Sequence, residues 1–361
     1  MLSKRALNRA LLARQLLLRR SDRNVFNAVT HLVGLQAQTP NAPYIALWSR
    51  LTNFDPKQLT ELINARRIVR IALMRGTIHS VTNCDCLELR PHFNSVLGRA
   101  ARGAFGKHLQ GLNLKQVESA ARKLLEKRPL SFDELGTLLQ KRWPDRDCAA
   151  LANTVRAVVP LVQIPPRGTW GNGGPATHVP AEAWLGGPLD ADPALDRMIH
   201  RYLAAFGPAT AHDVQSWSGI TGLRPTLESM RANLITFIDE GGNELFDIPD
   251  APRPNPETPA PPRFLPVFDN ILLAHADRRR ILSEAHRKML FGTAALLEGT
   301  ILIDGFVGAK WKIVQQRGRA VMAIEPFAPL RKRDRAMIYE EGAELLAFAL
   351  PAAESRHILF K

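Results

Sequence analysis

The sequence predicts an α+β protein with three winged-helix modules in tandem, followed by a small β-barrel at the C-terminal end. A pattern of three helices and two strands occurs twice between residues 111 and 250. After a proline-rich segment, the hydrophobic periodicity changes from helical to alternating, which is typical of strands. The length of 361 residues exceeds one ordinary core, so several modules are expected.

The first module is expected to cover residues 1–110. Ser3 is a suitable N-cap for its first helix. Two alternating segments flank Arg75-Gly76, a dipeptide that favours a tight turn between strands. The expected helices are 4–19, 24–33, 44–52 and 56–65, and the expected strands are 68–74 and 77–82.

The second and third modules are expected at residues 111–190 and 191–250. Ser131 and Thr210 are the predicted N-caps of corresponding helices, and each is followed by a further helix and then by strands. The similar offsets between the copies indicate a repeat. The helices are predicted at 115–126, 131–141, 149–158, 193–206, 210–217 and 225–233, with strands at 161–164, 234–239 and 244–248.

A proline-rich linker is expected at residues 251–263, because eight prolines occur between residues 249 and 266 and exclude a helix or a central strand. The last module, residues 264–361, is predicted to be a small β-barrel closed by a helix at 333–348. Its strands flank Asp304-Gly305, a strong two-residue hairpin signal. A second hairpin tip is expected at 315–319.

The charge of the chain is unevenly distributed. The net charge is +14. Residues 1–128 contain 22 basic and 7 acidic side chains, residues 129–262 contain 10 basic and 16 acidic ones, and residues 263–361 contain 16 basic and 11 acidic ones. Basic ends favour a polyanionic partner, of which nucleic acid is the commonest. No stretch is apolar enough to span a membrane, and three cysteines fit a reducing compartment, so we expect a cytoplasmic protein.

No metal or cofactor site is expected. Cys84 and Cys86 lack the spacing of common zinc sites, and Cys148 is remote from both. The glycines at 171, 173 and 174 are not followed by the residues of a phosphate-binding loop, and no dinucleotide-binding fingerprint is present.

Two glutamines stand out directly after a helix. Gly34 can end the helix and Pro40 prevents it from resuming, so Gln36 and Gln38 lie on a short extended segment. Alternation directs both side chains the same way, with Ala37 opposite. The pattern alone leaves two interpretations open: paired amides often bond only to nearby backbone, and they can also serve a site.

Four segments resemble one bacterial winged-helix family. These are residues 6–15 (ALNRALLARQ), residues 34–48 (GLQAQTPNAPYIALW), Arg75-Gly76-Thr77-Ile78-His79, and Phe268-Asp269-Asn270. Together they look like the AlkZ-type DNA glycosylases, which remove bulky N7-alkylguanine adducts and unhook azinomycin-type crosslinks. The most specific segment is Gln-x-Gln, because a sister branch has Gln-x-Asp. Gln38 therefore makes this chain similar to the branch linked to toxin self-resistance.

The resemblance implies that Gln36 and Gln38 are catalytic, that a β-hairpin enters the minor groove, and that three winged helices precede a C-terminal β-barrel. It implies a glycosylase acting on duplex DNA with alkylated guanine, and therefore near the nucleoid. A bulky or crosslinked base favours an open, C-shaped groove of stacked modules. An asymmetric lesion gives no reason to expect a dimer and no lysine stands out as a Schiff-base nucleophile, so a monomeric, monofunctional enzyme is expected. A non-catalytic regulator and a lesion binder stay open. The hairpin is assigned first to Asp304-Gly305 and second to 315–319, and Asp269-Asn270 is interpreted as a structural turn. By charge and position, the candidate DNA contacts are Lys4, Arg9, Arg75, His79, Lys310, Arg317 and Arg319.

Overall fold

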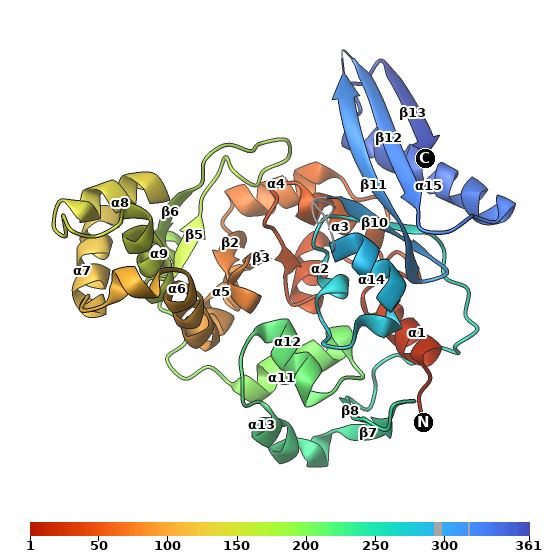
Figure 1. Ribbon diagram of the computed structural model, residues 1–361, viewed down its shortest axis with the longest axis horizontal. Helices are drawn as coiled ribbons and strands as arrows, with labels where there is room; N and C mark the ends of the chain where they lie inside the picture. Colours follow the sequence, from red (N-terminus) through yellow and green to blue (C-terminus); the bar gives the residue numbers. More distant parts are fainter. Residues whose placement is uncertain (292–297, 317) are drawn as a thin grey trace.

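The computed structural model describes residues 1–291, 298–316 and 318–361 and has a mixed α+β fold (Figure 1). Its N-terminal three quarters repeat one order of elements: helix, short strand, helix, helix, strand, strand. In the first unit these are α2 (Val25–His31), β1 (Leu35–Gln36), α3 (Ala42–Arg50), α4 (Pro56–Asn64), β2 (Ile68–Ala72) and β3 (Ile78–Thr82).

The second unit has the same order, and the third has it with one change, because a single bridge between Ala209 and Phe246 replaces the short strand. Capping boxes begin α8 at Ser131 and α12 at Thr210, as the sequence predicts. The second unit contains α7 (Leu114–Leu125), β4 (Leu130–Ser131), α8 (Phe132–Gln140), α9 (Cys148–Val158), β5 (Leu161–Gln163) and β6 (Thr177–Pro180). The third contains α11 (Leu195–Phe206), α12 (Ala211–Ser218), α13 (Arg224–Ser229), β7 (Ile235–Ile238) and β8 (Glu244–Asp247).

The strands of the first two units form one continuous sheet. Its strand order is β1-β3-β2-β5-β6-β4, and the units meet where β2 pairs antiparallel with β5. The third unit keeps its own two-stranded sheet, β7-β8. The remaining helices of this part are α1 (Lys4–Arg14), α5 (Asn83–Leu89), α6 (Asn94–Leu109), α10 (Ala181–Leu185) and the 3-10 turns η1 (Met74–Gly76), η2 (Arg90–Phe93) and η3 (Arg231–Asn233).

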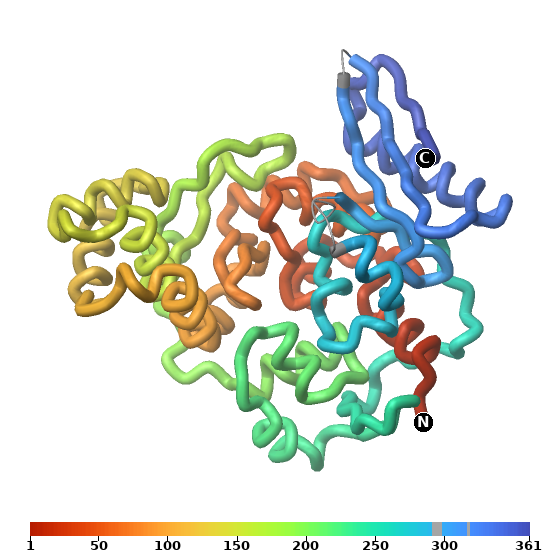
Figure 2. The backbone as a smooth tube through the Cα atoms, in the orientation of Figure 1, coloured from red at the N-terminus to blue at the C-terminus, as the bar shows by residue number. Residues whose placement is uncertain are grey.

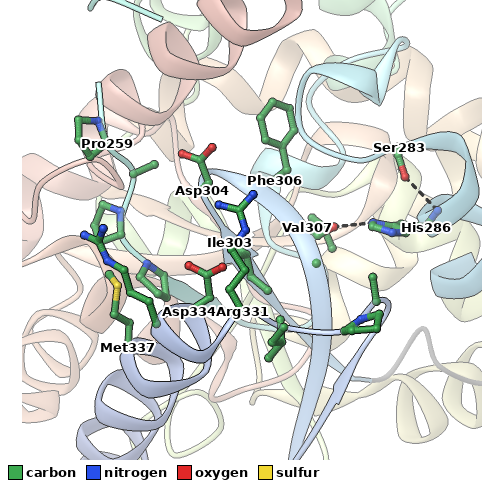
Figure 3. A pocket seen from close by; sticks show the side chains of 18 of the residues that line it. Pro259, Ser283, His286, Ile303, Asp304, Phe306, Val307, Arg331, Asp334 and Met337 are labelled. Atoms are coloured by element: carbon green, nitrogen blue, oxygen red, sulfur yellow. Dashed lines mark hydrogen bonds between the residues drawn. The ribbon is translucent and has the colours of Figure 1, made fainter. Parts of the chain in front are cut away.

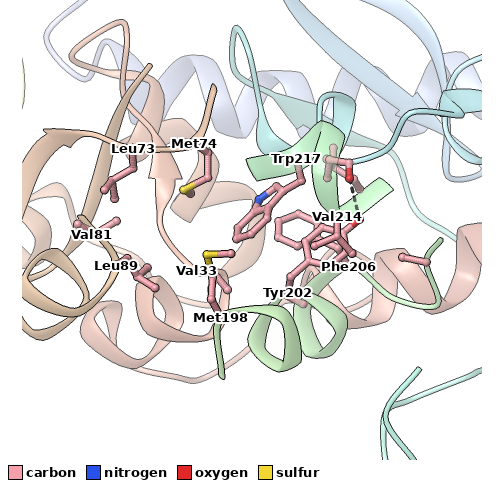
Figure 4. Packing of buried hydrophobic residues seen from close by; sticks show 14 of the residues in the cluster. Val33, Leu73, Met74, Val81, Leu89, Met198, Tyr202, Phe206, Val214 and Trp217 are labelled. Atoms are coloured by element: carbon pink, nitrogen blue, oxygen red, sulfur yellow. Dashed lines mark hydrogen bonds between the residues drawn. The ribbon is translucent and has the colours of Figure 1, made fainter. Parts of the chain in front are cut away.

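A shared apolar core joins the first and third units. Figure 4 shows Met74 and Val33 of the first unit facing Met198, Tyr202 and Trp217 of the third. The Trp217 and Tyr202 rings lie 4.9 Å apart between centroids, and both are buried. This packing holds η1, the turn that follows β2, against α12.

The prediction of a closed C-terminal β-barrel is wrong, because the sheet is open. Its order is β13-β12-β11-β10-β9, and the edge strands β9 and β13 do not pair. The helix α15 covers the apolar face, so burial does not require the sheet to curl onto itself. This part contains β9 (Arg263–Leu265), η4 (Asn270–Leu272), η5 (Arg278–Arg280), α14 (Glu284–Phe291), β10 (Gly299–Ile303), β11 (Phe306–Gln316), β12 (Arg319–Pro326), α15 (Lys332–Ala349) and β13 (Ser355–Phe360).

The proline-rich segment has no regular structure but is tied to α1. Arg9 Nε donates to the Thr258 carbonyl at 2.7 Å, and Arg14 Nε donates to the Pro252 carbonyl at 3.3 Å. Figure 2 shows the backbone of this segment passing beside α1 on its way to β9. The helix α1 is shorter than the predicted 4–19, since Leu16 adopts a left-handed φ of 58°.

Within the described chain, no helix combines the length and apolar character needed to cross a bilayer.

Candidate active site

The two glutamines follow a sharp reversal of the chain after α2. Val33 and Gly34 have φ values of 55° and 89°, which turn the backbone into β1. A Cβ atom at Gly34 would lie 2.6 Å from Val81 Cγ1, so only glycine fits against β3 there. The strand β1 then pairs antiparallel with β3, which places Gln36 directly opposite His79.

Gln36 has a buried carboxamide oxygen. The residue is 7% exposed, and among the described residues no donor reaches Oε1. His79 and Asn270 are buried beside the same segment, where the Asn270 side chain interacts with the His79 ring and Asn270 Nδ2 donates to the Gly34 carbonyl at 3.0 Å. An unsatisfied buried carbonyl oxygen is rare in folded proteins, so Gln36 Oε1 offers a place for a donor from outside the chain.

Gln38 lies beyond the end of β1 and is exposed. Its Oε1 accepts a hydrogen bond from the Ile78 N–H at 3.3 Å, and the Ala37 N–H donates to the Ile78 carbonyl at 2.8 Å. Backbone bonding by Gln38 therefore occurs, as one of the two interpretations of the sequence expects. It occupies one of the two lone pairs of the carbonyl oxygen and leaves the side chain open to solvent.

His79 is a neutral, fully buried ring. Its Nδ1 lies 3.0 Å from the Thr77 carbonyl and donates to it, so Nε2 carries a lone pair. Burial, reinforced by the charge of Arg75, lowers the pKa of His79 to about 3. With 0% of the residue exposed, His79 is not available as a DNA contact in this structure.

Two arginine side chains near this segment, Arg75 and Arg70, form no ion pair with a carboxylate of the described residues. Arg75 Nη1 donates to the Trp217 carbonyl at 2.6 Å, so the half-buried Arg75 connects η1 to α12. Burial and the neighbouring Arg278 lower the pKa of Arg75 to about 10. Arg70 of β2 is 1% exposed, and its Nη2 donates to the Ala37 carbonyl at 2.8 Å. No sequence motif marked Arg70 as a site residue, although a charged residue within the apolar strand Ile68–Ala72 was a usable signal.

The Asp304-Gly305 turn does not project from the molecule. A Cβ atom at Gly305 would lie 2.5 Å from Asn8 Oδ1 and 2.6 Å from Leu12 Cδ1, so the turn rests on α1. Arg9 has no exposed side-chain surface and forms an ion pair with Asp304 at 2.5 Å. The turn is seated on α1 and Arg9 is enclosed beneath it, so Arg9 and Gly305 present no surface to DNA in this structure, whereas the Asp304 side chain is half exposed.

Asp304 lines a cavity of about 920 Å³. Figure 3 shows the side chains around it. The proline-rich segment, the β10–β11 turn and the start of α15 line it, together with Lys4. Neither Gln36 nor Gln38 lines this cavity. Most of its lining is apolar, and Phe306 and Met337 are among the contributing side chains.

The other predicted DNA contacts are spread over the surface. Lys4 and Arg319 are exposed, whereas Lys310 Nζ lies 3.4 Å from Glu298 and 3.2 Å from Glu325. Arg317 lies outside the described residues. The described residues contain no group of three His, Cys, Asp or Glu side chains that could hold a metal ion.

Comparisons with known proteins identify the family. A family model described as "DNA glycosylase AlkZ-like" matches residues 29–348. The interstrand DNA cross-link repair glycosylase of Streptomyces sahachiroi is 24% identical over 358 residues, which cover 92% of each chain. The solved structure of Streptomyces sahachiroi DNA glycosylase AlkZ has the same fold, with a TM-score of 0.79 over 100% of both chains at 20% identity. Since the family model spans most of its length, the chain belongs to the AlkZ-like DNA glycosylase family.

Proposed function

We propose that this protein hydrolyses the N-glycosidic bond of cationic N7-alkylguanine in duplex DNA, in bulky adducts and in interstrand crosslinks. Family membership supports glycosylase activity, and the relative from Streptomyces sahachiroi, which is a cross-link repair glycosylase, supports crosslinks as substrates. The reaction serves DNA repair or toxin self-resistance. The protein acts as a monomer and a monofunctional enzyme on chromosomal DNA, and therefore in the cytoplasm at the nucleoid.

The chemistry of the leaving group makes two neutral amides sufficient. Glycosidic hydrolysis ordinarily needs an acid to protonate the leaving group and a base to activate water. N7-alkylguanine already carries a positive charge and leaves as a neutral base, so no proton needs to be donated. What remains is to hold a water near the anomeric carbon and to stabilise a cationic sugar. Carboxamide oxygens can do both, because they accept from water and carry partial negative charge.

The observation that carries this proposal is the pair of carboxamides on one short segment. No donor in the described part of the chain reaches the buried Oε1 of Gln36, and Gln38, two residues later, is exposed to solvent. A water bound between them would satisfy the Gln36 oxygen and remain accessible to a sugar at the surface.

The same proposal assigns DNA binding to the three helical units and the C-terminal sheet. The units have the element order of winged helices, and we infer that they form the C-shaped DNA-binding face. Of the two candidate hairpins, the β11–β12 tip at 315–319 is preferred, since the β10–β11 turn is seated on α1. The exposed Arg319 is its proposed phosphate contact.

The test uses a duplex oligonucleotide with one N7-methylguanine, followed by alkali to cleave at abasic sites. We expect strand scission by the native protein, and a loss of about 100-fold or more in single-turnover rate for Gln36→Ala and Gln38→Ala with DNA affinity retained. The native rate should be constant between pH 6 and 9, because neither carboxamide titrates. Absence of scission would favour a DNA-binding regulator or a lesion binder, and full activity of both variants would refute the assignment of the site.

A further inference from the structure

The peptide groups that join the two glutamines are both held by hydrogen bonds. The N–H of the 36–37 peptide donates to the Ile78 carbonyl at 2.8 Å. The carbonyl of the 37–38 peptide accepts from Arg70 Nη2 at 2.8 Å. Ala37 itself is fully buried, so no water can replace either bond. These two bonds determine how each peptide plane is rotated, and hence the directions in which the side chains at 36 and 38 leave the backbone.

Arg70 is an unusual donor for this task. Its side chain is buried in the central strand β2, and within the described chain it forms no ion pair with a carboxylate. Its Nη1 is buried and has no hydrogen-bond partner among the same residues. Burial, together with the charge of Arg167, lowers the pKa of Arg70 to about 10, which still leaves a cation at neutral pH. A buried guanidinium without a counter-charge is costly, so packing alone does not account for it.

The geometry of Arg70 connects the glutamine segment to the second unit. Nε and Nη2 both lie 3.3 Å from Gln163 Oε1 on β5, and Nη2 also reaches Ala37. The loop after β5 comes so close that a Cβ atom at Gly168 would lie 2.3 Å from Arg70 Cδ. The planar fork of one guanidinium thus spans β5 and the glutamine segment, which a single ammonium group cannot do.

We propose that Arg70 is a positioning residue for the glutamine pair, which it aims by holding the Ala37 carbonyl from behind the segment. This inference rests on the proposed function, since it assigns Arg70 a role in the reaction that Gln36 and Gln38 carry out. Arg70 does not touch the substrate. It acts through the backbone, and its removal lets the 37–38 peptide rotate and separates the two carboxamides from a common water.

The test measures single-turnover base release from N7-methylguanine duplex for Arg70→Met, and separately the affinity for an unmodified duplex of the same sequence. We expect the rate to fall about 100-fold with affinity changed less than threefold, because misplacement of reacting groups by about 1 Å has effects of this size. Arg70→Lys, which keeps the charge and can reach one acceptor, should recover part of the rate. If Arg70→Met does not fold, Arg70→Lys provides the same comparison of rate and affinity.

Two matched variants distinguish positioning from structural support. Arg90 is also 1% exposed, and its side-chain hydrogen bonds within the described residues go to Asn94 and the Arg156 carbonyl rather than to the glutamine segment. Arg90→Met should lower the melting temperature comparably and leave the rate within threefold of native. Gln163→Leu removes the partner of Arg70 on β5 and keeps the Ala37 bond, so its rate should fall less than fivefold.

A double variant gives the decisive outcome. If Arg70 acts through the glutamines, Arg70→Met combined with Gln38→Ala should be no slower than Gln38→Ala alone. Multiplicative losses in the double variant would overturn the inference, and so would equal rates for Arg70→Met and Arg90→Met. These failures differ from failure of the proposed function, in which the native protein releases no base or the glutamine variants keep full activity.

Discussion

His79 is a neutral ring near Gln36, and Arg70 and Arg75 are cations whose pKa burial lowers. The pKa of His79 is about 3, and the pKa values of Arg70 and Arg75 are about 10. None of these three side chains therefore changes charge between pH 5 and 8. They supply no acid or base near neutral pH, which agrees with the proposed substrate, whose leaving group already carries its charge.

The low pKa of His79 makes stability depend on pH. The unfolded chain binds a proton at this residue as the pH falls through about 6.5, whereas the folded chain does not until about pH 3. The stability that the neutral, buried His79 contributes is therefore fully present above pH 6.5 and is lost as the pH falls towards 3. Lowering the pH from 7 to 4.5 should reduce the unfolding free energy of both proteins. We expect this reduction to be about 2–3 kcal/mol smaller in His79→Gln than in the native protein.

Urea denaturation at the two pH values measures this difference. Replacement of the exposed His357 by Gln serves as the control and should leave the pH dependence unchanged. The same pH dependence in His79→Gln and in the native protein would contradict a neutral, buried His79.

At the scale of elements, α1 seats the β10–β11 turn. Arg5 and Arg9 both form ion pairs with Asp304, and Asn8 Nδ2 donates to the Gly305 carbonyl at 2.8 Å. The turn signal at Asp304-Gly305 was correct, since these residues have φ values of 46° and 83° between paired strands. A local signal predicts that a turn forms, but it does not show whether another helix covers it.

Arg9 and Arg319 should therefore respond oppositely to mutation. Arg9→Met removes a buried guanidinium from a half-exposed Asp304 and from two backbone carbonyls, so we expect a loss of about 2 kcal/mol in unfolding free energy. The salt dependence of DNA binding by Arg9→Met should match that of the native protein. Arg319→Ala should cost less than about 0.5 kcal/mol in stability but lower the salt slope by about one.

Urea denaturation and DNA affinity measured from low to moderate salt check both variants. A reduced salt slope for Arg9→Met would return Arg9 to the set of DNA contacts.

At the scale of the molecule, buried ion pairs bind α1 and α3 to distant segments. Arg14 of α1 pairs with Asp247 of β8 at 2.6 Å, with neither side chain exposed, and Arg50 of α3 pairs with Asp269 at 2.8 Å. These residues are more than 200 positions apart in the chain. The proline-rich segment between Asp247 and Asp269 is consequently held at both ends by buried ion pairs, and the parts of the chain before and after it pack together.

Asp247→Asn should destabilise the whole molecule. The change leaves Arg14 and Arg253 without their shared carboxylate, and removal of one partner from a buried pair typically costs about 3–5 kcal/mol. We expect one unfolding transition at a lower urea midpoint. Asp277→Asn, at an exposed pair with Arg279, is the control and should cost less than about 1 kcal/mol. Two separate transitions in the native protein would contradict the coupling.

The sequence by itself determined the features that depend on near neighbours. Ser131 and Thr210 cap their helices as predicted, and the repeated order of elements, the turns at Arg75-Gly76 and Asp304-Gly305 and the short extended segment that carries Gln36 follow from local patterns. Capping, turn geometry and periodicity are properties of a few consecutive residues, so they can be read without the fold. The strands β4 and β6 escaped prediction, because β4 has only two residues and β6 follows a stretch rich in glycine and proline.

Only the tertiary structure decided how those elements meet. The pairing of β2 with β5 merged two units into one sheet, and α15 kept the C-terminal sheet open. The same packing enclosed Gln36, buried His79 and brought Arg70 to the Ala37 carbonyl. Burial and hydrogen bonding between distant segments depend on which faces pack together, and that choice is made by the whole chain.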